Sequence, residues 1–264
     1  MLQITPIPAF TDNYHWLITK DDDSRAYIVD PGDHEPVQQA IEQRGLQLDG
    51  ILITHRHWDH VDGIKHLLAR YQTDTHPIPV YGPDSAQIPQ ITHKLYENDT
   101  VSLFDTTTLT VWETPGHTLE HIVYVGDSEN TPILFAGDTL FAAGCGRLFD
   151  GDAQQHFKSL QRMAKLPQET RVYCAHEYTL ANLAFAKAVE PNNPQLQERI
   201  QQENQKRQHN IPTIPSTIAL EQATNPFIRT HIDSVVQSVN QHWQADLQEE
   251  NEVFAALRRW KDEL

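Results

Sequence analysis

The sequence predicts an α/β fold that is followed by a smaller all-helical part. Up to about His176, short runs rich in β-branched and aromatic residues alternate with helical patterns, which is typical of an α/β sandwich. After Tyr178 the chain consists mainly of Ala, Leu, Gln, Glu and Arg at helical spacing, interrupted by prolines. A length of 264 residues allows one large domain or two smaller ones. We therefore expect a first domain over residues 1–176 and a helical domain over residues 177–264.

The predicted elements follow from hydrophobic periodicity. Apolar, β-rich runs bounded by turn residues predict strands at residues 16–18, 26–30, 51–54, 109–113, 122–125, 132–136 and 171–175. Helical spacing of apolar residues predicts helices at residues 35–44, 62–71 and 152–165. The Gln-rich stretch at residues 195–208 has the pattern of a solvated helix in the second domain.

Four potential metal ligands occupy residues 55–60, directly after the apolar stretch 50–53. Residues two apart in an extended segment point to the same side, so His55 and His57 can present both imidazoles to one ion. Asp59 and His60 are adjacent to each other and point in other directions, which favours two ions over one. Imidazole and carboxylate together suit zinc, iron or manganese, whereas calcium and magnesium prefer oxygen ligands alone.

Three further polar residues end apolar strand-like runs. His117 follows the run 109–113, Asp138 follows the run 132–136, and His176 follows the run 171–175. Open β architectures place their sites at strand ends of this kind. Each residue taken singly could instead be a capping or hydrogen-bonded side chain. Four such strand ends in one chain, counting the run that precedes His55, predict a metal site.

These residues and their neighbours resemble the metallo-β-lactamase superfamily and, within it, the glyoxalase II group, the hydroxyacylglutathione hydrolases. The resemblance covers nearly the whole chain and implies an αββα sandwich, in which two β-sheets lie face to face with helices outside. The superfamily motifs are Asn13-Tyr14, Asp30-Pro31-Gly32, T-H-x-H-x-D-H at residues 54–60, Gly116-His117-Thr118 and residues 135–141. The match also includes residues 225–229, and the motifs that point to glyoxalase II lie at residues 144–151, 176–179 and 257–262.

The resemblance implies a binuclear metal site with seven protein ligands, most simply occupied by zinc, with iron or manganese as alternatives. It assigns one ion to His55, His57 and His117, the other to Asp59, His60 and His176, and Asp138 to both. A hydroxide shared by the ions would attack the thioester carbonyl of S-D-lactoylglutathione and release D-lactate and glutathione. This is the second step of methylglyoxal detoxification, and it needs no side-chain nucleophile.

The resemblance also implies a glutathione site. Its expected members are Arg147, Phe149, Tyr178, Arg258 and Lys261. Glutathione carries two carboxylates, for which guanidinium and ammonium groups are suitable partners. Many relatives have Lys and Tyr where this chain has Arg147 and Phe149, and because Phe149 lacks a hydroxyl, we expect only a backbone contribution there.

Composition restricts the partners and the compartment. A net charge of −16, from 36 acidic and 20 basic residues, makes nucleic-acid binding unfavourable and weighs against the nucleases of the superfamily. Cys145 and Cys174 lie in separate motifs, so we expect both to be reduced and non-catalytic. The N-terminal residues lack a signal-peptide pattern, and no run approaches 18 apolar residues. We expect a cytoplasmic monomer that binds a small glutathione thioester and neither nucleic acid nor membrane.

Three alternatives share parts of this pattern. One is a single-iron persulfide dioxygenase with a 2-His-1-carboxylate ligand set. A second is another hydrolase of the superfamily that acts on a lactam, a lactone or a different thioester, and a third is a non-catalytic metal-binding protein. The complete set of seven ligand positions and the C-terminal helical part favour glyoxalase II, while metal identity, oligomeric state and acyl-group breadth stay open.

Overall fold

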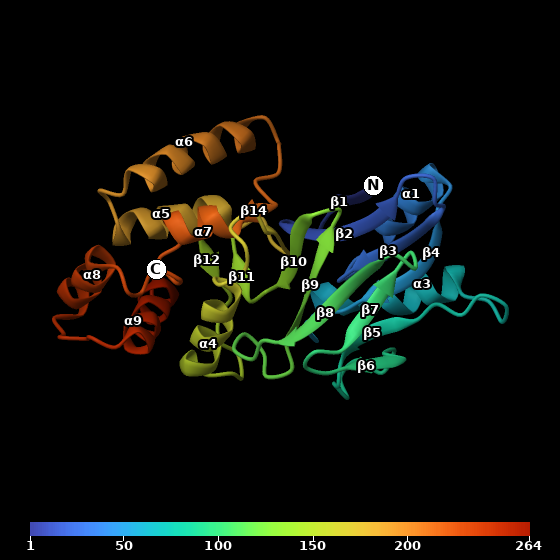
Figure 1. Ribbon diagram of the computed structural model, residues 1–264, viewed down its shortest axis with the longest axis horizontal. Coiled ribbons are helices and arrows are strands. Elements are labelled where there is room, and N and C mark those ends of the chain that lie inside the picture. The colour runs from blue at the N-terminus through green and yellow to red at the C-terminus, as the bar shows by residue number, and fades with distance from the viewer. The chain divides into compact units, whose positions relative to one another are not determined.

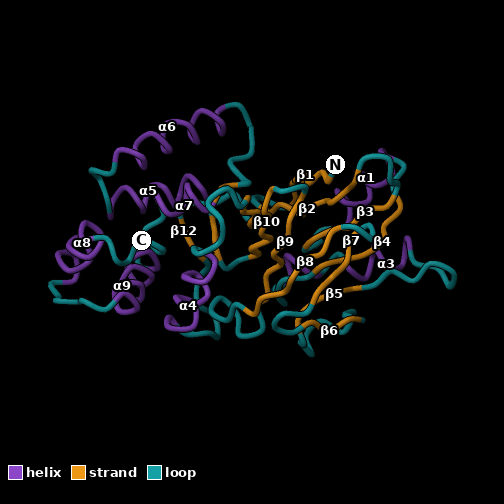
Figure 2. Tube along the Cα trace, in the orientation of Figure 1, coloured by secondary structure: helices purple, strands orange, loops and turns teal.

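A computed structural model describes residues 1–264, and the chain falls into two compact units. Unit 1 comprises residues 1–113 and 120–137, and unit 2 comprises residues 114–119 and 138–264. Strands predominate in unit 1 and helices in the C-terminal part of unit 2 (Figure 2). The predicted α/β architecture with a helical C-terminal part is therefore confirmed.

Unit 1 contains two sheets. The first has the strand order β1 (Leu2–Ala9), β2 (Asn13–Lys20), β3 (Arg25–Val29), β4 (Gln47–Leu52), β5 (Val80–Pro83) and β6 (His93–Leu95) (Figure 1). Strands β1 to β3 are antiparallel, and β3 to β6 are parallel. The strand β1, which the sequence reading did not predict, carries Pro6 and Pro8. It lies at an edge of the sheet, where the missing N–H groups of proline are tolerated.

The second sheet of unit 1 is antiparallel. Its strands are β7 (Thr100–Leu103), β8 (Thr107–Glu113), β9 (Ile122–Ser128) and β10 (Thr131–Gly137). Tyr124 of β9 donates a 2.8 Å hydrogen bond to the carbonyl of Ile53, directly after β4, and the Tyr27 ring of β3 lies edge to face against Phe104 after β7. The two sheets of unit 1 therefore form a sandwich.

Helices α1 (His34–Arg44) and α3 (Ile64–Tyr71) pack against the first sheet. Val37 and Ile41 of α1 and Ile64 and Leu67 of α3 join one core cluster with β-strand residues such as Ile28. Helix α1 begins where the Asp33 side chain accepts a hydrogen bond from the Glu35 amide, which is a standard N-cap. The helix predicted over residues 62–71 begins two residues later, at Ile64. Residues 58–61 form the separate short helix α2 (Trp58–Val61), and residues 62 and 63 connect it to α3.

Unit 2 has two pairs of short strands and six helices. The strands are β11 (Leu140–Phe141), β12 (Gly144–Cys145), β13 (Arg171–Cys174) and β14 (Ser216–Thr217). The helices are α4 (Ala153–Met163), α5 (Thr179–Val189), α6 (Pro194–Gln208), α7 (Ile218–Thr224), α8 (Asp233–Trp243) and α9 (Glu250–Asp262). The solvated helix predicted over residues 195–208 matches α6, which Asn193 caps and Pro194 opens.

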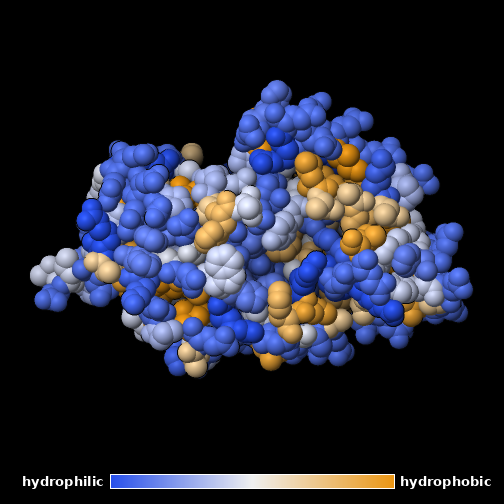
Figure 3. Space-filling model, turned by 180° about the vertical axis from the view of Figure 1, so that it is seen from behind, coloured by the Kyte–Doolittle hydropathy of each residue, from blue (hydrophilic) through white to orange (hydrophobic).

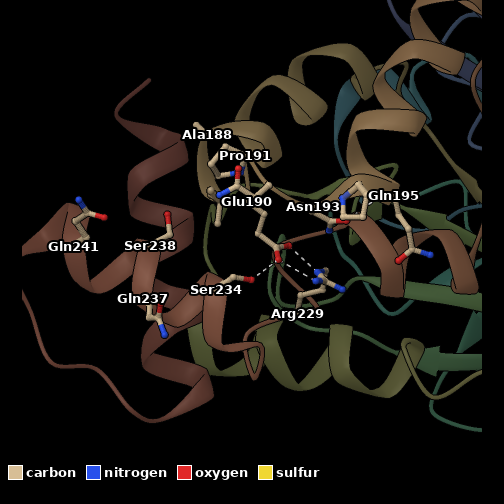
Figure 4. Close-up of a pocket in the computed structure, with 13 residues that line it drawn as sticks. Ala188, Glu190, Pro191, Asn193, Gln195, Arg229, Ser234, Gln237, Ser238 and Gln241 are labelled. Atoms are coloured by element: carbon tan, nitrogen blue, oxygen red, sulfur yellow. Dashed lines mark hydrogen bonds and ion pairs between the residues drawn. The ribbon is translucent and has the colours of Figure 1, made fainter.

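An open polar pocket of unit 2 is lined by the α5–α6 connection and by α8 (Figure 4). Glu190 accepts hydrogen bonds from Arg229 at 2.7 and 2.9 Å and from Ser234 at 2.7 Å. Glu190, Arg229 and Ser234 thus bond to one another. They connect the end of α5 to α8 and present no uncompensated charge to a ligand. Across the face of the molecule seen in Figure 3, the surface is mostly hydrophilic, in keeping with the charged composition. No helix combines the length and apolar character that a membrane crossing requires.

Candidate metal centre

The ligand set of unit 1 lies just beyond β4. His55 Nε2 is 3.0 Å from His57 Nδ1, and His60 Nε2 is 3.6 Å from Asp59 Oδ2. Two ligands at the tetrahedral angle of an ion, with bonds of about 2.0–2.1 Å, stand about 3.3 Å apart. The donor atoms therefore have the spacing of metal ligands. Asp59 and His60 lie on the short helix α2.

The carboxylate of Asp30 holds this ligand segment in place. Its oxygens accept hydrogen bonds from the amide of Thr54 at 2.8 Å and from the Thr54 hydroxyl at 2.7 Å. Asp30 Oδ2 also lies 3.1 Å from His60 Nδ1. A carboxylate at one ring nitrogen fixes the imidazole orientation and leaves the lone pair of the other nitrogen for a metal. Asp30 therefore leaves Nε2 as the His60 nitrogen that is available to an ion.

Two residues that follow the turn at residues 114–119, Glu120 and His121, support the same segment. Glu120 accepts a 3.2 Å hydrogen bond from the amide of Arg56 and forms an ion pair with its guanidinium. The ring of His121 stacks on His55 with 4.8 Å between centroids. Both contacts hold the residues between β4 and α2.

The ligand set of unit 2 is centred on one carboxylate oxygen. Asp138 Oδ2 lies 3.4 Å from His117 Nε2 and 3.3 Å from His176 Nε2. All three residues are buried. The Asp138 carboxylate is thus close to both imidazoles, and side chains of these types could hold a metal ion. His117 and Asp138 also belong to a cluster of side chains whose donor atoms could hold an ion.

Hydrogen bonds hold His117 of unit 2, and ring stacking holds His176. His117 Nδ1 donates to the Arg147 carbonyl at 2.8 Å, so Nε2 carries the lone pair. The amide of Phe149 donates back to the His117 carbonyl at 3.1 Å. The His176 ring stacks on Tyr178 with 4.7 Å between centroids and 2° between planes. The segment that carries Arg147 and Phe149 is therefore tied to a ligand, which places predicted substrate residues beside this ligand set.

Helix α4 contributes a residue that the sequence reading missed. His156 is fully buried, and its Nε2 donates to the carbonyl of Thr139, next to Asp138, at 3.1 Å. Burial lowers the pKa of His156 to about 3, so its ring is neutral at physiological pH. A Cβ at Gly116, which precedes His117, would lie 2.3 Å from His156 Nδ1. The sequence offered one indication of this role, because His156 lies on the apolar face of the helix predicted over residues 152–165.

The predicted glutathione residues differ in accessibility. The Arg147 side chain is 72% exposed, and its Nε lies 3.7 Å from Asp262 Oδ1. Phe149 and Tyr178 are also exposed. Arg258 is only 3% exposed, and it donates to the Cys145 carbonyl at 3.0 Å and to Asp262 at 2.9 Å. The two arginines therefore share the carboxylate of Asp262.

Lys261, on the same helix as Arg258, is partly buried. Its ammonium hydrogen-bonds to Asn182 Oδ1 and lies 5.9 and 5.8 Å from the ring centroids of Phe185 and Phe227. Burial, followed by repulsion from Arg258, lowers the pKa of Lys261 to about 8. Its charge is therefore sensitive to pH in the mildly alkaline range.

Both cysteines are buried, and they form no disulfide. Burial raises the pKa of Cys174 to about 12 and also raises the pKa of Cys145. The protonated forms are poor nucleophiles and poor metal ligands, which agrees with the non-catalytic role predicted for them.

Two family models match adjacent parts of the chain. The model of the Metallo-beta-lactamase superfamily matches residues 12–176, and that of the Hydroxyacylglutathione hydrolase C-terminus matches residues 177–264. The hydroxyacylglutathione hydrolase of Alkalilimnicola ehrlichii is 49% identical over 265 residues, with 100% of each chain covered.

Two solved structures are also similar. ETHE1 from Myxococcus xanthus matches with a TM-score of 0.64 at 22% identity, covering 99% of this chain and 98% of that one. This likeness shows the fold alone. TTHA1623, solved in a di-iron-bound form, matches with a TM-score of 0.58 at 25% identity, covering 84% of this chain and 99% of that one.

The fold and the candidate ligand sets define a protein of the metallo-β-lactamase superfamily. The superfamily and the α/β fold class predicted from the sequence are thus confirmed. Within this class, the chain belongs to the hydroxyacylglutathione hydrolase family, whose members are hydrolases.

Proposed function

We propose that this chain hydrolyses S-D-lactoylglutathione and other S-2-hydroxyacylglutathiones, releasing glutathione and D-lactate or the corresponding 2-hydroxy acid. This reaction is the second step of methylglyoxal detoxification. The observation that carries the proposal is the match of the whole chain, including residues 177–264, to hydroxyacylglutathione hydrolases. A hydrolase of the same fold that recognises only the acyl group would not need this C-terminal part to bind its substrate.

The proposed metal centre has the ligand set expected from the sequence. One divalent ion is assigned to His55, His57 and His117, the second to Asp59, His60 and His176, and Asp138 to both. The ligand spacings within each unit and the position of Asp138 Oδ2 between two imidazoles support this assignment. Nitrogen and carboxylate donors suit zinc, with iron or manganese as alternatives, and a related structure was solved with two irons.

The charge of the ligand set fits hydrolysis. When bound, two divalent ions would lower the pKa of a shared water and so supply a hydroxide nucleophile near neutral pH. The seven side chains are five imidazoles, held neutral as ligands, and two carboxylates. Their two negative charges leave part of the four positive charges of two divalent ions uncompensated, which favours an anionic nucleophile and the developing oxyanion. Asp30 and the Arg147 carbonyl orient His60 and His117, so that the ligand nitrogens keep their lone pairs for the ions.

We assign residues 1–176 to catalysis and residues 177–264 to substrate binding, with Arg147, Phe149, Tyr178, Arg258 and Lys261 as the glutathione site. Arg147 is open to solvent and can reach a substrate carboxylate. Arg258 is buried, and its hydrogen bonds to the Cys145 carbonyl and Asp262 indicate that it also holds the segment leading to Arg147. Phe149 contributes through its backbone, because its ring has no hydrogen-bonding group.

We further propose that the protein works in the cytoplasm as a monomer. Two cysteines that form no disulfide agree with a reducing compartment. Measurement of the molar mass in solution by light scattering tests the oligomeric state directly.

The decisive assay follows the loss of thioester absorbance when the metal-loaded protein meets S-D-lactoylglutathione or the same acyl group on coenzyme A. We expect rapid cleavage of the glutathione thioester and slow cleavage of the coenzyme A thioester. Equal rates would show that the predicted glutathione residues do not select the substrate. No cleavage of either thioester would refute the proposed function.

A further inference from the structure

We propose that Phe10 and Trp58 form an aromatic shelf that binds the acyl group of the substrate, an inference that rests on the proposed function. Trp58 begins α2 and stands between the ligands His57 and Asp59, while Phe10 lies in the turn between β1 and β2. The two ring centroids are 5.0 Å apart, with 65° between the planes. Two segments that are distant in the sequence thus place one pair of rings beside two metal ligands.

The turn that carries Phe10 is fastened to the ligand Asp59. Asn13, which is buried, donates from Nδ2 to Asp59 Oδ2 at 3.0 Å and to the Asp59 carbonyl at 3.5 Å. Phe10 also lies edge to face against His15, whose Nε2 accepts a 3.0 Å hydrogen bond from the Asp33 amide. The shelf therefore has a defined position relative to the ligand, which a specificity element requires.

The backbone of Phe10 is held in an unusual conformation. Its φ of 50° lies in the left-handed region, which a bulky side chain rarely adopts. Such conformations persist where the surrounding structure imposes them, and they cluster at functional sites. Here the strained position is the one that brings the Phe10 ring against Trp58.

Both rings are open to solvent. Trp58 is 60% exposed and Phe10 is 47% exposed, in a chain with a net charge of −16. The other exposed aromatic ring of unit 1 is Tyr96, whose hydroxyl donates to Asp84 and so has a polar partner. Phe10 has no polar group in its side chain, and the face of an indole is equally apolar. An apolar surface beside a reactive centre is suited to a ligand group that lacks charge.

The two ends of the substrate differ in the surface that they need. The glutathione end carries two carboxylates and needs cations such as Arg147 and Lys261. The acyl end carries no charge, and its carbonyl must lie at the metal ligands that flank Trp58. Because the planes of the two rings meet at 65°, the pair presents a ring edge and a ring face to a bound group. Aromatic groups prefer edge-to-face contacts of this kind. The shelf therefore suits 2-hydroxyacyl groups with an apolar or aromatic side chain.

The test compares kcat/KM for S-mandeloylglutathione, which has an aromatic acyl group, with kcat/KM for S-D-lactoylglutathione. The proteins are the wild-type chain, Trp58→Ala, Phe10→Ala and the control Tyr96→Ala. We expect Trp58→Ala to lower the mandeloyl-to-lactoyl ratio about 10-fold or more, since loss of apolar contact in a substrate pocket typically has this size. Phe10→Ala should change the ratio in the same direction, and Tyr96→Ala should leave it unchanged.

The ratio compares two substrates on the same active molecules, so partial loss of metal or of folded protein cancels. An unchanged ratio in both Trp58→Ala and Phe10→Ala would overturn the role of the shelf alone. Failure of the wild-type chain to cleave either thioester would overturn the proposed function and the shelf with it. An equal fall of the ratio in Tyr96→Ala would show that the effect is not specific to the shelf and would also overturn it.

Discussion

Replacement of Glu221 by Ala should strongly destabilise unit 2. Glu221 and Arg199 are both fully buried, with exposures of 0% and 1%, and Arg199 Nη2 lies 2.7 Å from Glu221 Oε1. The Glu221 carboxylate also accepts hydrogen bonds from the Ala143 amide at 2.8 Å, from Asn225 at 2.9 Å and from Ser216. The variant would leave a buried guanidinium without its counter-charge and several buried donors without an acceptor.

The size of the effect follows from these contacts. Removal of one partner of a buried ion pair costs about 3–5 kcal/mol, because the remaining charge stays desolvated. The carboxylate also loses three hydrogen bonds, each of which contributes about 1.5–3 kcal/mol, so the total loss should not fall below this range. In domains of about 150–250 residues each kcal/mol lowers Tm by about 2–4 °C, so a loss of about 3–5 kcal/mol should lower Tm by at least roughly 6–20 °C.

The assay is urea unfolding followed by far-UV circular dichroism, with thermal unfolding as a second measurement. The control is the double variant Arg199→Met with Glu221→Leu, which removes both charges and keeps the apolar volume. We expect this double variant to recover only part of the lost free energy of unfolding, because no charge remains buried without a partner, whereas the donors from Ala143, Asn225 and Ser216 still lack their acceptor. A Glu221→Ala protein within about 1 kcal/mol of the wild type would refute the reasoning, since that is the usual effect of an ordinary substitution.

Three further predictions concern the candidate site. Asp138→Ala should abolish activity and lower the metal content, because its Oδ2 stands between two ligand histidines; retention of two metals per chain by elemental analysis would contradict the bridging assignment. His156→Leu should weaken metal binding about 10–100-fold, as is typical when a group that supports metal ligands is lost, because it removes the hydrogen bond to the Thr139 carbonyl. Chelator competition measures this change, and His156→Gln, which can restore the donor, should recover part of it; equal affinities in the Leu variant and the wild type would exclude a supporting role. The KM for the glutathione thioester should rise as the pH increases through about 8, because the lowered pKa of Lys261 means that its positive charge is present below this pH and lost above it. Lys261→Met should have a high KM at all pH values and lack this rise, and a rise that persists in the variant would assign the titration to another group.

Local spacing was sufficient to predict the candidate ligand residues and the order of the main elements. The close set at residues 55–60 was recognisable because strand geometry alone brings residues two apart to one side. His117, Asp138 and His176 were recognisable because each follows an apolar run. Local patterns were less informative for β1, whose prolines argue against a strand until its place at the edge of the sheet is known.

The sequence by itself therefore predicted the fold class and the candidate metal ligands, because periodicity and ligand spacing are properties of short segments, and the resemblance of its motifs to known proteins indicated the family. Only the tertiary structure decided which side chains support them. Packing buries Arg258. Contacts between segments that are distant along the chain give the hydrogen bond from His156 to Thr139 and the ring contact between Phe10 and Trp58. Burial and partner choice depend on how the elements pack, and no local pattern contains that information.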